Sequence, residues 1–87
     1  MKFYVYLIAS TNKNKIISYV GYTNNLEKRL LVHNSSKGAK FTRGRKWKMI
    51  YSESFTTKSK AMKAEIKLKK NSLLRKKIKE KFFYEKK

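Results

Sequence analysis

Glu65 is the foremost candidate for a chemical role in this sequence, because it is a charged residue at a position that suits an apolar side chain. The chain has 87 residues, and its 24 lysines and arginines outnumber 5 acidic residues to leave a net charge of +19. Glu65 falls within a helical stripe of small and apolar residues formed by Ala61, Ala64 and Leu68. A carboxylate that faces a core is costly unless it is paired or binds a metal. Two interpretations stay open: a partly buried salt bridge, or a ligand for Mg²⁺, which often takes only one or two protein carboxylates.

A second group of candidates consists of two residues on a predicted helix and two on predicted strands. Arg29 and His33 are four residues apart, so they are neighbours on one helix face. Arginine offers a planar fork for a phosphate, and histidine offers a donor or an acid or base near neutral pH. Tyr6 and Tyr19 could act as a base or a proton relay if cations lower their pKa. The alternatives are a surface arginine, a half-buried histidine and two packing tyrosines.

Residues 35–46 form a basic segment, which we call the basic segment from here on. Its apolar residues show no helical or strand periodicity, and this pattern predicts a loop. It combines five basic side chains with one aromatic residue, a composition that suits contact with a phosphate backbone and stacking on bases. The alternative is a mobile, solvated loop. The candidate nucleic-acid-binding residues are Lys37, Lys40, Phe41, Arg43, Arg45 and Lys46.

The positive charge is spread along the chain, with a net of +9 over residues 1–55 and +10 over residues 56–87. An evenly basic chain favours a polyanionic partner, and 40% hydrophobic residues predict a folded core, here one domain over residues 1–87. The absence of cysteine excludes disulfides and thiolate chemistry. No apolar run approaches the roughly 18 residues of a membrane span, and residues 3–9 suit a strand better than a signal segment. We therefore expect a cytoplasmic protein that binds nucleic acid and no membrane. The basic C-terminal helix could lie on a membrane surface, but its apolar stripe is used more economically to cover the sheet.

The elements that must position these residues follow an α+β pattern in the order β-β-α-β-α-α, with helices covering a small sheet. Strands are predicted at residues 3–9, 16–22 and 47–55, and residues 10–15 suit a hairpin loop. A symmetric hairpin places Tyr6 opposite Tyr19 on one face, with Val5, Leu7 and Val20 on the other. In the third strand, Met49, Tyr51 and Phe55 are expected to share a face.

Three helices are predicted, over residues 26–34, over residues 58–70 and from residue 72 onward. Residues 23–25 and 56–57 supply cap candidates for the first two helices, and Ser72 is the cap candidate for the last. In the last helix, Leu74, Ile78 and Phe82 recur at four-residue steps, which predicts an apolar stripe.

These positions also carry a family resemblance. Tyr4-Val5-Tyr6-Leu7-Ile8 and Tyr19-Val20-Gly21 resemble the paired signatures of the GIY-YIG nuclease domain, although Tyr4 stands where the family has its first glycine. Residues 23–34 resemble the family's first helix with its arginine, and Ala64-Glu65-Ile66-Lys67 is similar to the helix with the metal-binding glutamate. Residues 37–44 and 51–53 resemble the small stand-alone bacterial members, which are related to the nuclease domain of the excision-repair subunit UvrC.

The resemblance implies a three-stranded antiparallel sheet flanked by helices, and an endonuclease that hydrolyses phosphodiester bonds with one Mg²⁺ or Mn²⁺ ion. Glu65 would bind the metal and Arg29 the scissile phosphate. Tyr6 and Tyr19 would position and help to deprotonate the attacking water, with the choice of base open, and His33 would contact phosphate or relay protons. DNA is favoured over RNA. The alternative is a non-catalytic basic nucleic-acid-binding module with the same fold, and the sequence leaves the oligomeric state open.

Overall fold

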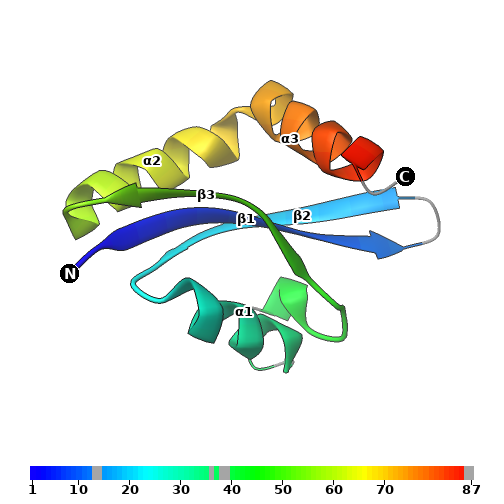
Figure 1. Ribbon diagram of the computed structural model, residues 1–87, viewed down its shortest axis with the longest axis horizontal. Coiled ribbons are helices and arrows are strands. Elements are labelled where there is room, and N and C mark those ends of the chain that lie inside the picture. The colour runs from blue at the N-terminus through cyan, green and yellow to red at the C-terminus, as the bar shows by residue number, and fades with distance from the viewer. Residues whose placement is uncertain (13–14, 36, 38–39, 86–87) are drawn as a thin grey trace.

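A three-stranded antiparallel sheet with helices on both faces forms the centre of the structure, a computed structural model that describes residues 1–12, 15–35, 37 and 40–85. The strand order β2-β1-β3 makes β1 the central strand. Figure 1 shows α1 below the sheet and both α2 and α3 above it. The predicted α+β fold and element order are confirmed. The elements are β1 (Phe3–Asn12), β2 (Lys15–Thr23), α1 (Leu26–Asn34), the short 3₁₀ helix η1 (Lys40–Thr42), β3 (Lys48–Phe55), α2 (Lys58–Lys70) and α3 (Ser72–Glu85).

Two hydrophobic clusters lie on opposite faces of β1, because successive side chains of a strand point to opposite sides. Val5 and Leu7 pack with Val20 and with Ala61 and Leu68 of α2. On the other face, the buried residues Tyr6, Ile8 and Trp47 form a cluster against which Tyr19 of β2 and Leu26 and Leu30 of α1 pack. The predicted division of the first two strands into these faces is confirmed. Tyr6 and Tyr19 therefore lie on the side of the sheet that α1 covers.

The register of the first hairpin differs from the symmetric prediction by two residues. Tyr6 pairs with Gly21, and Tyr19 pairs with Ile8. The strands continue into the polar segment that was predicted as a loop, up to the pair Asn12 and Lys15, and residues 13–14 lie outside the described residues. A shift of two residues keeps every side chain on its face, since the side-chain period of a strand is two.

A bulge in β3 corrects the prediction for the third strand. Leu7 pairs with Tyr51, while the next residue of β1, Ile8, pairs with Met49. The extra residue in β3 reverses the alternation of side chains. Met49 therefore packs with the Tyr6 and Ile8 cluster. Tyr51 and Phe55 pack on the opposite face.

Helix caps explain why the helices start where they do. The Asn25 side chain accepts a hydrogen bond from the Lys28 amide at 3.1 Å, and the Thr57 hydroxyl accepts one from the Lys60 amide at 3.2 Å. The predicted cap of α3 is wrong: Asn71, one residue before Ser72, accepts from the Leu74 amide at 3.1 Å. Within the described residues, no helix is both long and apolar enough to cross a membrane.

Candidate active site

The Tyr6 hydroxyl is the centre of the candidate site. Tyr6 is only 1% exposed, and its hydroxyl lies 2.8 Å from Nε2 of His33. The Arg29 Nε donates a longer hydrogen bond of 3.4 Å to the same oxygen. Arg29 and His33 are one turn apart on α1, which packs over the Tyr6 face of the sheet. The structure thus brings together three of the residues that the sequence singled out.

Gly21 is the residue that makes room for this tyrosine. It lies opposite Tyr6 in the sheet, and a Cβ at this position would collide with the Tyr6 hydroxyl and ring. The absent side chain lets the Tyr6 ring lie across β2. Gly21 was not among the site residues predicted from sequence, although its place at the end of Tyr19-Val20-Gly21 was the available signal.

His33 is held from its other side by a residue of the basic segment. It is fully buried, and its Nδ1 lies 2.9 Å from the hydroxyl of Thr42, which is also fully buried. The two ring nitrogens therefore each face a hydroxyl group. This contact links α1 to η1, nine residues further along the chain.

Two further residues fasten the basic segment to α1. The Trp47 indole donates to the Thr42 carbonyl at 2.8 Å. The Asn34 side chain forms two hydrogen bonds with the Trp47 backbone, accepting at 2.6 Å and donating at 3.1 Å. Sequence reasoning missed Thr42, Asn34 and Trp47 as supports of the site, because polar residues in an aperiodic segment give no signal for the partners they find.

Burial decides the protonation of Tyr6 and His33, the central pair of the candidate site. Burial raises the pKa of Tyr6, the Arg29 guanidinium opposes this rise, and the nearby Tyr19 and Glu65 add to it. The cations thus fail to lower the pKa of Tyr6, which the catalytic interpretation had required. Burial, together with Arg29, lowers the pKa of His33. His33 is therefore neutral at pH 7.

Tyr19 connects the central pair to the basic segment. Its half-buried ring packs edge-on against His33, with 5.2 Å between ring centroids, and stacks on Phe41 at 6.2 Å. The ring centroids of Phe41 and Trp47 are 6.3 Å apart, and the Arg45 guanidinium lies 6.0 Å from the centroid of the Phe41 ring. Of the predicted nucleic-acid-binding residues, Phe41 and Arg45 thus adjoin the site. The others are exposed on the same segment: Lys37, Lys40, Arg43 and Lys46.

Glu65 approaches the site from the α2 side of the sheet. Its side chain is 17% exposed and forms an ion pair of 3.8 Å with Lys69, one turn further along α2. The carboxylate is close enough to contribute to the raised pKa of Tyr6. Glu65 thus has a salt-bridge partner, but that partner is half-exposed, so the pair is weak and the two interpretations of Glu65 stay open.

The donor set around Glu65 fits a hydrated hard cation. The described part of the chain has no group of three His, Cys, Asp or Glu side chains that could hold a metal, so a closed protein cage is excluded there. A single carboxylate suits Mg²⁺ or Mn²⁺, because Mg²⁺ usually keeps several waters and binds through one or two carboxylates plus substrate phosphates.

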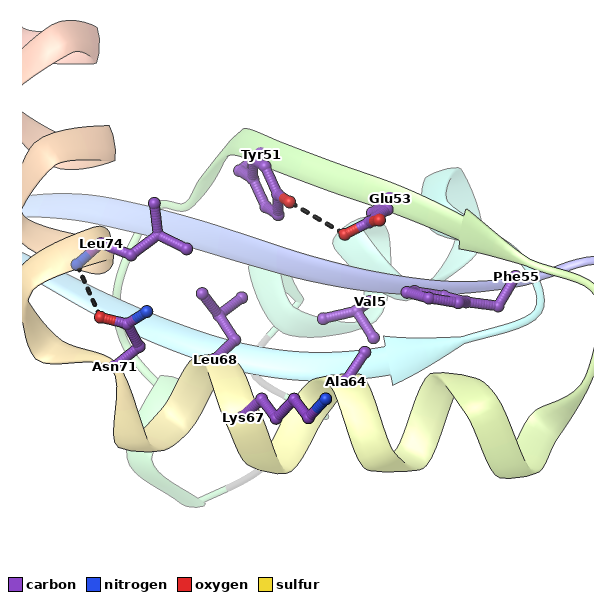
Figure 2. Close-up of a pocket in the computed structure, with 9 residues that line it drawn as sticks. All are labelled: Val5, Tyr51, Glu53, Phe55, Ala64, Lys67, Leu68, Asn71 and Leu74. Atoms are coloured by element: carbon purple, nitrogen blue, oxygen red, sulfur yellow. Dashed lines mark hydrogen bonds between the residues drawn. The ribbon is translucent and has the colours of Figure 1, made fainter.

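A separate pocket of about 270 Å³ lies on the opposite face of the sheet, between α2 and the strands (Figure 2). Val5, Phe55 and Leu68 line it together with Glu53, whose carboxylate accepts a hydrogen bond from Tyr51 at 3.1 Å. Asn71 also lines this pocket while it caps α3. None of the candidate catalytic residues lines this pocket, so it is separate from the candidate site.

A short three-stranded sheet, with tyrosines on its first two strands and an arginine on the helix that follows, is the arrangement expected of a GIY-YIG nuclease. Residues 2–79 match the family model described as the GIY-YIG catalytic domain, and the chain belongs to this family of nucleases.

Among its relatives, a UPF0213 protein of Bacillus velezensis is 49% identical over 85 residues, which cover 97% of this chain and 78% of the relative. A UPF0213 protein of Bacillus licheniformis is 54% identical over 69 residues, which cover 78% and 68% of the two chains. The solution NMR structure of a UPF0213 protein from Bacillus halodurans is 36% identical, with a TM-score of 0.47 and coverage of 88% and 80%.

Proposed function

We propose that this protein is a divalent-metal-dependent endonuclease that hydrolyses phosphodiester bonds in DNA. The observation that carries the proposal is that several candidate residues converge on one buried hydroxyl, that of Tyr6. Tyr6 is hydrogen-bonded to His33 and Arg29, and the Glu65 carboxylate acts on its pKa. A tyrosine, a neutral histidine, an arginine and a carboxylate supply the groups that phosphodiester hydrolysis needs.

Arg29 is assigned to the scissile phosphate. Its Nε bond to Tyr6 fixes the plane of the guanidinium, and no carboxylate pairs with it among the described residues. The outer guanidinium nitrogens can then donate two parallel hydrogen bonds to phosphate oxygens. The charge on these oxygens grows during hydrolysis, so a fixed cation beside them stabilises the transition state.

Tyr19 is assigned to the attacking water. Tyr6 is buried, its hydroxyl already has two partners, and burial raises its pKa. Tyr19 is half-buried and lies against the same His33 ring. We therefore assign Tyr6 and His33 to positioning and proton relay, and Tyr19 to contact with the water.

Glu65 is assigned as the ligand of one Mg²⁺ or Mn²⁺ ion. Its ion pair with Lys69 is weak, so the ion would replace Lys69 as the partner of the carboxylate. When bound, the cation would supply charge neutralisation at the phosphate. We further propose that DNA is the substrate in preference to RNA, and that residues 1–87 act as one nuclease domain in the cytoplasm. The basic segment would contact the DNA backbone.

The test is a nicking assay on single-stranded, double-stranded and branched DNA with Mg²⁺ or Mn²⁺. Wild type should cleave, and Glu65→Ala should lose at least about 100-fold in rate while it still binds DNA. Glu80→Gln is the matched control, since this exposed glutamate on α3 lies outside the site. If wild type and Glu65→Ala show the same low background while both bind DNA, the protein is a non-catalytic nucleic-acid-binding module.

A further inference from the structure

A polar notch of about 400 Å³ lies between β1 and the end of the basic segment, outside the candidate active site. It is lined by Ser10 and Thr11 of β1, both of which carry a hydroxyl group, and by Gly44, Arg45 and Lys46. None of its lining residues is acidic. Hydroxyl-bearing residues beside a guanidinium and an ammonium group are typical of a recognition set for a phosphate anion.

The backbone of the basic segment brings the two cations to β1. Gly44 has a φ of 77°, in the left-handed region that favours glycine. Among the residues that line the notch, Ser10 is only 7% exposed, whereas Thr11 and Lys46 are exposed. A ligand in the notch would therefore meet one buried residue, Ser10, and solvent-accessible donors of Thr11 and Lys46.

The notch lies in line with the active site along β1. Ser10 and Tyr6 are four residues apart on the same face of the strand, a separation of about 13 Å. A continuous row of side chains connects the notch to the candidate active site. Arg45 lines the notch and lies over Phe41, which in turn stacks on Tyr19. A strand of nucleic acid along this line would meet cations and aromatic rings without an intervening carboxylate.

We propose that this notch is an accessory subsite for a backbone phosphate of the same nucleic-acid strand whose scissile phosphate lies at Arg29. The inference rests on the proposed nuclease function, which places the scissile phosphate at Arg29 and so sets the path of the nucleic-acid strand. A separation of about 13 Å corresponds to roughly four nucleotides along one strand of a duplex, which advances 3.4 Å per nucleotide. The subsite would set the length of strand that the protein needs for full affinity.

The test measures binding rather than cleavage, in the Glu65→Ala protein without metal. Fluorescently labelled oligonucleotides are lengthened one nucleotide at a time, and Kd is measured by anisotropy. Affinity should rise in a step once the strand is long enough to reach the notch. Thr11→Val, which removes the hydroxyl and keeps a β-branched side chain, and Lys46→Gln should each weaken the longer strands about three- to tenfold and leave the shorter ones unchanged.

The control is Lys77→Gln, which removes the same charge from an exposed position on α3. For single strands, Lys46→Gln should also lower the slope of log Kd against log salt by about 0.7, the value for one lost phosphate contact. If Thr11→Val and Lys46→Gln show the same step as Lys77→Gln, the subsite does not exist. Nicking by the wild-type protein is measured separately, so a protein that shows the step but never cleaves would retain the subsite and lose the endonuclease assignment.

Discussion

The Tyr6 oxygen accepts a hydrogen from the Arg29 Nε and faces Nε2 of a neutral histidine. We infer that the Tyr6 hydroxyl donates to His33, whose Nδ1 then carries the proton and donates to Thr42. In this arrangement the Tyr6 hydroxyl and both ring nitrogens of His33 each have a hydrogen-bond partner. A proton that leaves Tyr6 has one acceptor already in place, so the pair can act as a relay.

The two tyrosines should therefore respond differently to loss of the hydroxyl. Tyr6→Phe leaves the buried Nε2 of His33 without a partner, and we expect it to cost about 1–3 kcal/mol in urea unfolding as well as activity. Tyr19→Phe should change the free energy of unfolding by less than about 0.5 kcal/mol and lower the nicking rate about 100-fold. A Tyr19→Phe protein that cleaves like wild type would move the contact with water to Tyr6.

His33 should make the stability of the fold sensitive to mild acid. It is the single histidine of the chain, and burial and Arg29 lower its pKa in the folded state. Below the ordinary histidine pKa of about 6.5, the unfolded chain takes up a proton that the folded chain resists. The stability contributed by neutral His33 is therefore complete above this value and falls as the pH drops toward the folded pKa.

Thermal unfolding between about pH 7.5 and pH 5 measures this effect. Wild type should lose stability through this range, which spans the ordinary histidine pKa of about 6.5. His33→Gln should unfold more easily at neutral pH because it loses the contacts with Tyr6 and Thr42, but its stability should change less with pH. Parallel curves for the two proteins would show that another group is responsible.

The helices were predictable from sequence because capping residues and apolar stripes are local signals, as at Asn25 and Thr57. The strands were predictable as elements, but their pairing was not, because polar residues of the first hairpin can extend a strand as readily as form a loop. The bulge in β3 likewise left no mark in the sequence. Of the site, the residue types pointed to Tyr6, Arg29 and Glu65, whereas the support from Thr42 and Gly21 depends on tertiary packing.

The sheet itself positions the Tyr6 ring, and Gly21→Ala tests this. An added Cβ would meet the Tyr6 ring, so either the ring or β2 must move. We expect a loss of about 1–3 kcal/mol in urea unfolding, typical of overpacking, together with loss of nicking activity. Ser18→Ala is the control on the same strand and should stay within about 0.5 kcal/mol of wild type. A fully stable and active Gly21→Ala protein would contradict the role assigned to this close contact.

For the whole molecule, the charge of +19 has opposite effects on folding and on binding. The described residues have a radius of gyration of 12.7 Å, which is close to the Debye length of about 10 Å at 0.1 M salt. At about 0.01 M salt the Debye length is roughly 30 Å, so most of the lysines and arginines repel one another across the molecule. The same field attracts a nucleic acid, and the interaction also weakens as salt is added.

Salt should therefore stabilise the free protein while it weakens the complex. Between about 0.01 M and 0.1 M sodium chloride, we expect Tm to rise by several degrees, since a change of 1 kcal/mol shifts Tm by about 4–8 °C in a domain of this size. With a bound oligonucleotide, the rise should shrink or reverse, because the complex loses affinity over the same range. Sucrose at equal osmolality controls for effects other than screening. A Tm that is independent of salt in the free protein would mean that the positive charges are spaced too widely, or paired too well, for repulsion to limit stability. In that case the surface would also lack the strong field that the proposed DNA binding requires.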